Sequence, residues 1–174
     1  MNVTDKNLLL ACEQGNISGQ KLVFEKYAGK ILGICNRYFE IEKANKIIEN
    51  VFFEAFEKLK SNIKTDINLF LFLRAIALEK IKEEILKYKF NSYKEEPVAN
   101  NLEGDFKIGV DANRLCEIIQ ELDTTKRFIL NLYMIEGYSF SQVANLLHLK
   151  EGDVKRIYSI AKREVMEKSV EVLA

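Results

Sequence analysis

The sequence predicts an all-α protein of two small helical domains joined by a flexible linker. Apolar residues recur at spacings of three and four along most of the 174 residues, and the alternation typical of strands is absent. Residues 91–111 break this pattern and contain the only proline, Pro97. A helix-turn-helix pattern follows near the C-terminus. The hydrophobic content, 48%, is enough for two small cores.

The first domain is predicted to cover residues 1–90. Its helices are expected at residues 8–14, 19–38, 44–60 and 69–89. Gly15 is a suitable residue to end the first helix, because glycine adopts the left-handed backbone found after helix C-termini. The second helix is expected to turn Leu22 and Val23 inward. Residues 61–68 are polar and form a predicted loop.

The predicted linker, residues 91–111, has few periodic apolar residues. Structureless stretches of this length are uncommon inside one compact domain, so they indicate a boundary. The second domain is predicted over residues 112–174. Asp123 is expected to cap a helix over residues 124–136, after a first helix with an apolar face that ends at Leu122.

Two short helices and a tight joint are predicted within residues 136–163. Ser139 is a suitable N-cap for a helix that starts near Phe140. The apolar pattern stops at His148 and resumes at Val154. Two helices around a turn of three to four residues form the helix-turn-helix, whose second helix lies in the DNA major groove.

The second of these helices is basic on one side. Between Lys155 and Arg163 there are four basic residues and no acidic one, which suits a helix that faces phosphates. The candidate DNA-contacting residues are Lys155, Arg156, Ser159, Lys162 and Arg163. Helical hairpins are also common core structure, so the spacing alone leaves both interpretations open.

Charge and composition restrict the remaining functions. The 26 basic and 26 acidic residues cancel, so any contact with nucleic acid must come from local patches. No apolar stretch is long enough for membrane insertion, and the N-terminal residues lack a secretion signal, so a cytoplasmic protein is expected. Three scattered cysteines and a single histidine favour reduced thiols over a disulfide or metal site. No paired nucleophile and base is recognisable, so neither an enzyme nor a cofactor is expected.

Residues 122–163 carry the most specific resemblance to a known family: LDTTKRFILNLYMIEGYSFSQVANLLHLKEGDVKRIYSIAKR. This segment resembles the fourth region of the extracytoplasmic-function subgroup of sigma-70 family RNA polymerase sigma factors. The N-terminal domain is similar to the family's second region, more loosely, through LLLACEQGNISGQKLVFEKYAGKIL, VFFEAF and FLRAIA. The resemblance covers nearly the whole chain outside the linker.

The resemblance implies a sigma factor that directs promoter recognition and transcription initiation, with core RNA polymerase, promoter DNA and an anti-sigma factor as partners. The helix-turn-helix would bind the minus-35 element, and the N-terminal domain would bind polymerase and the minus-10 strand. The implied polymerase-binding residues are Lys43, Lys46, Glu49, Asn50 and Phe53. The candidate minus-10 contacts are Asn62, Lys64, Asn68, Arg74 and Lys80, a set that an ordinary solvated loop and helix face would equally explain.

The sequence departs from the family at several of these positions. Lys43 and Lys46 lie where the family presents acidic residues to polymerase. Ile157 and Ile160 replace frequent arginines, and His148 replaces the usual turn glycine, so a strained or re-shaped turn is expected there. Two alternatives to a sigma factor remain: a degenerate sigma-like protein-binding regulator and a stand-alone helix-turn-helix transcriptional regulator.

Overall fold

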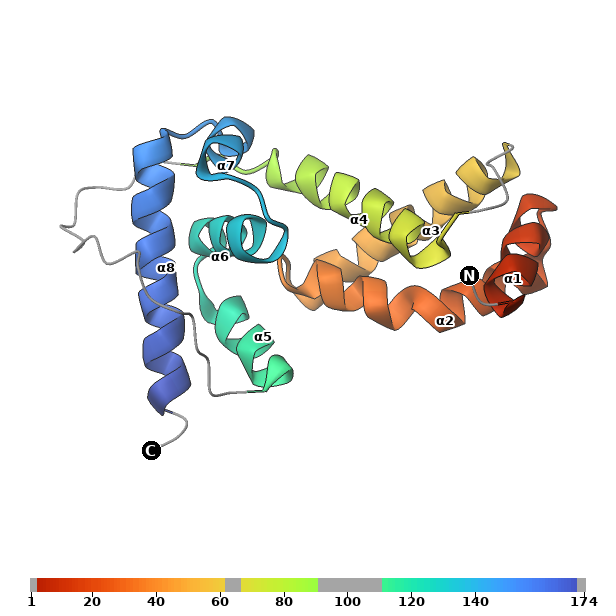
Figure 1. Cartoon of the computed structure of the whole chain (residues 1–174), viewed down its shortest axis with the longest axis horizontal. Coiled ribbons are helices and arrows are strands. Elements are labelled where there is room, and N and C mark those ends of the chain that lie inside the picture. Colours follow the sequence, from red (N-terminus) through yellow and green to blue (C-terminus); the bar gives the residue numbers. More distant parts are fainter. Residues whose placement is uncertain (1–2, 62–66, 91–110, 172–174) are drawn as a thin grey trace. The chain divides into compact units, whose positions relative to one another are not determined.

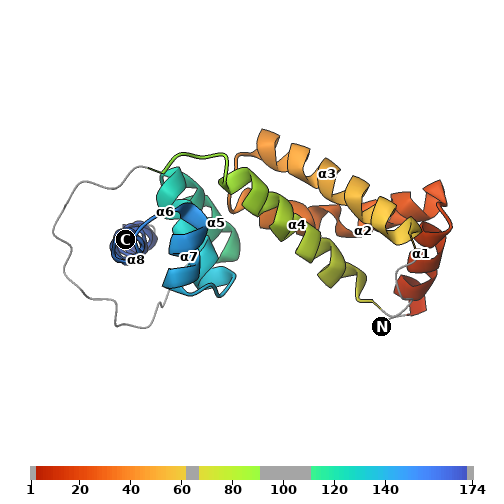
Figure 2. The same ribbon diagram turned by 90° about the horizontal axis from the view of Figure 1, so that it is seen from above.

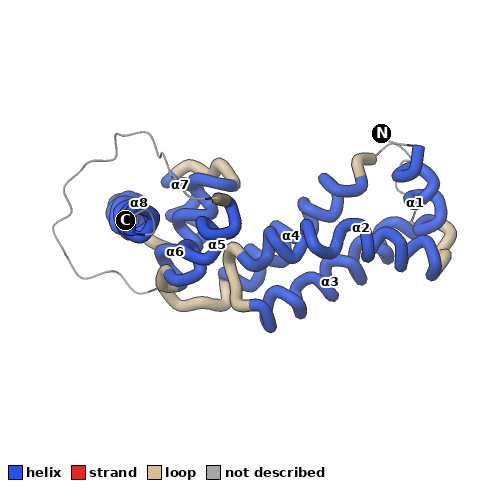
Figure 3. Tube along the Cα trace, turned by 90° about the horizontal axis from the view of Figure 1, so that it is seen from below, coloured by secondary structure: helices blue, strands red, loops and turns tan. Residues whose placement is uncertain are grey.

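The computed structural model of the chain describes residues 3–61, 67–90 and 111–171 (Figure 1). All regular elements in these ranges are helical, and Figure 3 shows no strand among them. The chain divides into two compact units, Met1–Glu84 and Ile85–Ala174. The all-α prediction is therefore confirmed. The domain and linker assignments stay predictions, because residues 91–110 lie outside the described ranges.

The first unit is built from four helices, α1 (Val3–Glu13), α2 (Ile17–Asn36), α3 (Ile41–Lys60) and α4 (Leu69–Ile85). Helices α1, α2 and α3 pack against one another, and α4 runs alongside α2 and α3 in Figure 2. Gly15 ends α1 in the left-handed conformation, with φ 69°. Asn16 then caps α2 by accepting a hydrogen bond from the backbone N–H of Gly19 at 3.1 Å.

Helices α1 and α2 approach each other closely at Gly19. A Cβ atom on Gly19 would lie 2.4 Å from Cβ of Ala11, a separation that real atoms do not adopt. Gly33, further along the same helix, has nothing within 4 Å of the corresponding position. Of the three glycines of α2, only Gly19 is required by packing, since Gly29 also has nothing within 4 Å of the corresponding position.

Several details of the first unit differ from the sequence predictions. Helix α1 begins at Val3 rather than at residue 8, and α2 and α3 begin two and three residues earlier than predicted. Leu22 is 53% exposed, whereas Val23 is fully buried. One residue along a helix rotates the side chain by about 100°, and at this point of α2 the rotation carries Leu22 out of the core while Val23 points into it. Helix α4 ends at Ile85, four residues before the predicted position 89, and residues 86–88 form a turn.

The second unit contains α5 (Ala112–Glu121), α6 (Thr124–Leu130), the π-helix η1 (Asn131–Ile135), α7 (Phe140–Leu147) and α8 (Glu151–Glu171). The long helix α8 packs against α5, α6 and α7. Asp123 caps α6 as predicted, accepting hydrogen bonds from the N–H groups of Thr125 and Lys126. The predicted helix over residues 124–136 is correct in extent, but its last turn is a π-helix.

A buried arginine joins α5 to α6. The guanidinium of Arg127 donates hydrogen bonds to the carbonyl oxygens of Gln120, at 2.6 Å, and Leu122, at 3.0 Å. These carbonyls belong to the end of α5, where helical partners run out. Only 7% of Arg127 is exposed. A buried cation paired with helix-terminal carbonyls thus fixes the junction of the two helices.

We predict opposite effects of alanine at Gly19 and Gly33 of α2. Gly19→Ala should lower the free energy of unfolding by about 1–3 kcal/mol, because the added methyl group separates α1 from α2. Gly33→Ala should raise it by about 0.5–1 kcal/mol, because the unfolded chain loses conformational freedom at no steric cost. Urea denaturation followed by circular dichroism measures both. Equal effects of the two substitutions would contradict the close packing at Gly19.

Candidate nucleic-acid interface

Helix α7 begins with a complete capping box. The backbone N–H of Gln142 donates to Oγ of Ser139 at 3.2 Å, and the backbone N–H of Ser139 donates to Oε1 of Gln142 at 2.8 Å. Both contacts occupy groups that the first turn of a helix leaves unpaired. The predicted N-cap at Ser139 is confirmed, and the start of the helix-turn-helix is fixed at this residue.

The turn between α7 and α8 depends on a left-handed residue. His148 has φ 54° and ψ 40°, and its N–H donates to the carbonyl of Ala144. The next N–H, that of Leu149, donates to the same carbonyl at 3.0 Å. His148 is the only non-glycine residue with positive φ in the described part of the chain. The expected strain at the turn is therefore present, and the exposed imidazole has no role in the core.

Three aromatic rings, one each from η1, α7 and α8, pack against one another and join these elements. Tyr133 of η1 stacks on Phe140 of α7 with ring centroids 3.9 Å apart and planes at 6°. Tyr158 of α8 meets both rings edge-on, at 4.7 Å and 5.4 Å. Burial raises the pKa of Tyr158 above its ordinary value, so its phenol stays neutral beside the stack. Sequence reasoning missed this cluster, because Tyr133 lies outside the two helices of the motif.

The polar face of α8 holds most of the predicted DNA-contacting residues. Side-chain exposure is 46% for Lys155, 19% for Arg156 and 54% for Arg163. Ser159 is half-buried, and its hydroxyl donates to the carbonyl of Lys155. Lys162 differs from the expectation, because only 9% of it is exposed. It lies against the unit rather than on the open face.

The two isoleucines of α8 have a structural explanation. Ile157 is fully buried and Ile160 is 7% exposed, so both pack into the core of the second unit. Arginines at these positions would have to leave that core. The exposed basic face of α8 is consequently narrow and is carried by Lys155, Arg156 and Arg163.

The three cations of this face, the exposed Lys155 and Arg163 and the half-buried Arg156, each have a carboxylate partner on the same helix. Nζ of Lys155 lies 2.6 Å from Oε1 of Glu151 and 5.9 Å from the ring centre of Phe140. Nη2 of Arg156 lies 3.2 Å from Oδ1 of Asp153. Nε of Arg163 lies 3.9 Å from Glu167. The acidic residues flank the basic run in sequence, and their helical spacing of three and four was the available signal.

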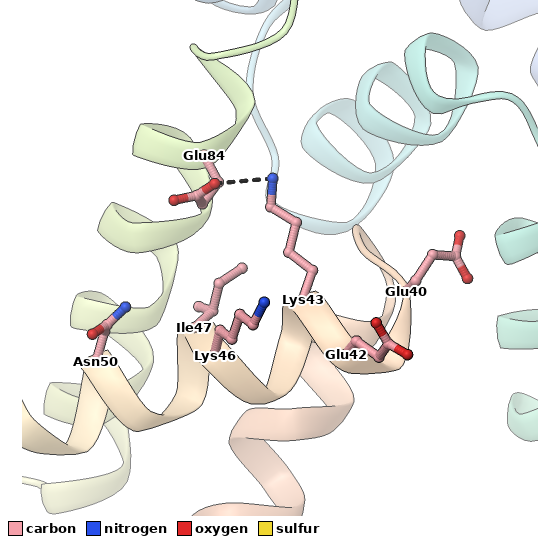
Figure 4. A pocket seen from close by; sticks show the side chains of 7 residues that line it. All are labelled: Glu40, Glu42, Lys43, Lys46, Ile47, Asn50 and Glu84. Carbon is pink, nitrogen blue, oxygen red and sulfur yellow. Dashed lines mark ion pairs between the residues drawn. The ribbon is translucent and has the colours of Figure 1, made fainter.

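The predicted polymerase-binding residues lie along α3. Nζ of Lys43 is 2.9 Å from Oε2 of Glu84 on α4 and 4.8 Å from the ring centre of Phe39. Lys43, Lys46 and Asn50 line a pocket of about 450 Å³, together with Glu40, Glu42, Ile47 and Glu84 (Figure 4). Glu49 is exposed. Phe53 is 71% exposed, so its ring is accessible on the same face of α3 as Lys46, Glu49 and Asn50.

The residues predicted to contact the minus-10 strand are only partly described. Asn62 and Lys64 lie outside the described residues. Asn68 caps α4, since its Oδ1 accepts from the N–H of Leu71 at 3.1 Å. Arg74 is half-buried on α4. Lys80 lies 2.7 Å from Oε2 of Glu54 and 3.2 Å from Glu83.

The carboxylate of Glu54 forms the centre of an ion-pair network between α3 and α4. Hydrogen bonds from Lys58 and then from Lys80 hold the pKa of Glu54 below its ordinary value. Lys58 also lies 3.8 Å from Glu79 of α4. Lys80 therefore links two helices, and its charge is largely compensated within the unit.

The cysteines behave as core residues. Burial raises the pKa of Cys12 to about 11 and that of Cys35 to about 12, so both remain protonated thiols at neutral pH. In the described ranges no cluster of three or more His, Cys, Asp or Glu side chains is placed to hold a metal ion. No described helix is long and apolar enough to cross a bilayer.

Comparisons with known proteins give structural similarity without sequence matches. No protein-family model matches the chain, and no curated protein sequence matches it. The structure of CnrH in complex with the cytosolic domain of CnrY is similar with a TM-score of 0.47 and 18% identity, over 98% of this chain and 99% of that chain. The sigma factor RpoE in complex with the anti-sigma factor NepR from Bartonella quintana is similar with a TM-score of 0.41 and 17% identity, over 86% and 97%.

The left-handed turn generates a prediction about stability. His148→Gly should raise the free energy of unfolding by about 1 kcal/mol, because glycine adopts positive φ without steric cost, whereas His148→Val should lower it by about 1–2 kcal/mol. Asn145→Gly is the control, since this exposed position has ordinary helical backbone and should lose a few tenths of a kcal/mol. Thermal unfolding measures the series. Destabilisation by His148→Gly would show that the left-handed turn is not formed in solution.

Proposed function

We propose that this chain is a sigma factor of the extracytoplasmic-function type, which binds core RNA polymerase and directs it to promoters. The observation that carries the proposal is the helix-turn-helix, with its capped first helix, left-handed turn at His148 and basic face on α8. These features occur in the segment whose sequence resembles the fourth region of the family most specifically. The protein would act in the cytoplasm, where polymerase and promoter DNA meet.

The basic face of α8 is proposed to bind the minus-35 element. The first turns of a recognition helix approach base edges in the major groove, and Lys155 and Arg156 lie in those turns. Lysine and arginine donate hydrogen bonds to O6 and N7 of guanine. Arg163, two turns further along the exposed face, is placed for phosphate, and Ser159 lies between them. Lys162 has a minor part at most, because it is mostly buried.

The first unit is proposed to bind polymerase and the minus-10 strand. The exposed face of α3, with Lys46, Glu49, Asn50 and Phe53, offers one aromatic anchor surrounded by polar groups, as contact surfaces often do. Asn62, Lys64, Asn68, Arg74 and Lys80 are proposed to lie near the melted strand. An anti-sigma factor is the remaining proposed partner, as the family resemblance implies.

The deciding experiment is reconstitution with core polymerase from the same organism, followed by sequencing of the transcripts. We expect promoter-dependent transcripts with the wild-type chain, and their loss with the Lys155→Ala, Arg156→Ala double variant. Each of these residues should contribute about 1–3 kcal/mol where it reads a base. Lys168→Ala is a suitable control, because it removes a charge near the other end of α8, where Lys168 pairs with Glu121 of α5.

Other outcomes would identify the alternatives. Polymerase binding without any promoter-dependent transcript would indicate a degenerate sigma-like regulator. Sequence-specific DNA binding without polymerase binding would indicate a stand-alone transcriptional regulator. Unchanged promoter use by the double variant would remove Lys155 and Arg156 from the proposed interface.

The polymerase contact can be tested at Lys46. This residue forms no ion pair with any residue that the structure describes, whereas reversal of Lys43 would also break its pair with Glu84. If Lys46 meets an acidic patch on the cognate polymerase, Lys46→Glu should weaken the complex with core polymerase at least tenfold, because like charges across an interface are costly; if Lys46 faces solvent beside the contact, the affinity should stay unchanged. Lys21→Glu on α2, 75% exposed, is the control. Equal affinity of both variants and wild type in a titration would place the contact elsewhere.

A further inference from the structure

The first turns of α8 pair each potential DNA-binding cation with an acidic residue that precedes it. Glu151 lies four residues before Lys155, and Asp153 lies three residues before Arg156. The side chains of Glu151 and Asp153 are 45% and 24% exposed, so neither pair is sealed from solvent. The Lys155 ammonium also lies 5.9 Å from the ring centre of Phe140. Both cations therefore have anionic partners before any DNA is present.

A phosphate and a carboxylate compete for the same ammonium or guanidinium group. Exposed ion pairs are weak, and losing one changes an equilibrium by about two- to fivefold. Such pairs can break when DNA binds, but the free energy needed to break them lowers the affinity for DNA. Carboxylates that remain beside the DNA also repel its phosphates.

We infer that Glu151 and Asp153 set the DNA affinity of the recognition helix by competing with phosphates for Lys155 and Arg156. This inference rests on the proposed function, because it requires that α8 binds DNA. The two acidic residues are affinity-setting residues rather than DNA contacts. Their effect applies to every DNA sequence, since phosphates carry no sequence information. They keep the free protein from residing on non-specific DNA.

The competition has a characteristic salt dependence. A cation that neutralises a phosphate releases condensed counterions, which contributes a slope of about −0.9 to log K against log salt. When Lys155 leaves Glu151 for a phosphate, the freed carboxylate requires a cation of its own, and the net release falls. Removing the carboxylate restores the full release of counterions from the DNA. The slope thus separates competition from a change in helix stability.

Two other roles of these carboxylates predict different results. An acidic residue that accepts a hydrogen bond from N4 of cytosine would contribute to affinity, so its removal would weaken binding. An acidic residue that only stabilises the N-terminus of α8 would alter the thermal midpoint but not the salt slope. Only competition with phosphate predicts tighter binding together with a steeper slope.

The test uses the full chain and a labelled mixed-sequence DNA duplex. Dissociation constants of wild type, Glu151→Gln and Asp153→Asn are measured by fluorescence anisotropy from about 50 to 200 mM salt. Glu117→Gln is the matched control, because it removes the same charge from an exposed ion pair on α5. Circular dichroism at the assay temperature verifies that all four proteins are folded.

We expect each α8 variant to bind about two- to fivefold more tightly than wild type, with a slope steeper by up to about 0.9, and the control to match wild type. Wild-type binding combined with unchanged or weaker binding by both variants would overturn the inference and leave the proposed function intact. An equal gain by Glu117→Gln would also overturn it, since net charge would then be the cause. Absence of binding by all four proteins at the lowest salt would overturn the inference and the DNA-binding part of the proposed function together.

Discussion

The conformation of His148 is the constraint on which the candidate interface depends. One residue with φ 54° reverses the chain between α7 and α8, and the carbonyl of Ala144 receives the two N–H groups that follow. A residue in ordinary helical or extended backbone would send α8 in another direction. Tyr133 and Phe140 stack on each other before the turn, and the turn then brings Tyr158 of α8 edge-on against both rings. Strain at one exposed residue is thus offset by aromatic packing, and the basic face of α8 follows from both.

Charge compensation is the second general property of the molecule. The net charge of the chain is zero, and several lysines are also neutralised locally: Lys43, Lys80 and Lys155 each lie within 3 Å of a carboxylate oxygen. In the first unit the pairs connect α3 to α4, so they contribute to the fold. Lys168 and Glu164 of α8 likewise pair with other helices, with Glu121 of α5 and Lys126 of α6. The pairs of Lys155, Arg156 and Arg163, by contrast, lie within α8 and connect no other helix. Pairs of the second kind can exchange partners without loss of tertiary structure, which is a property that a reversible binding surface requires.

Features that depend on neighbouring residues in the sequence were predicted well, and features that depend on partners in other helices were not. The caps at Asp123 and Ser139 and the left-handed turn at His148 were predictable, because each depends on residues within one turn. The π-helical turn, the buried Arg127 and the burial of Lys162 were not, because they depend on partners in other helices. The loop at residues 61–68 and the linker at residues 91–111 were predicted from composition alone and stay predictions, because residues 62–66 and 91–110 lie outside the described ranges. In the candidate site, the basic run from Lys155 to Arg163 indicated the cations but not their carboxylate partners, because Glu151, Asp153 and Glu167 lie outside that run.

The burial of Ile157 and Ile160 restricts what α8 can do in the proposed function. A recognition helix with arginines at those positions would present a broad basic face, whereas here the exposed cations are confined to one strip. Fewer phosphate contacts mean a smaller electrostatic contribution to binding, and the internal carboxylates reduce it further. In the proposed function, a helix-turn-helix with so few exposed cations would hold DNA only weakly by itself. Promoter selection would then require a second binding surface, such as the proposed polymerase-binding face of α3 with Phe53, which would raise the effective concentration of α8 at the DNA. A weak DNA contact and the need for a large partner would thus have the same physical cause.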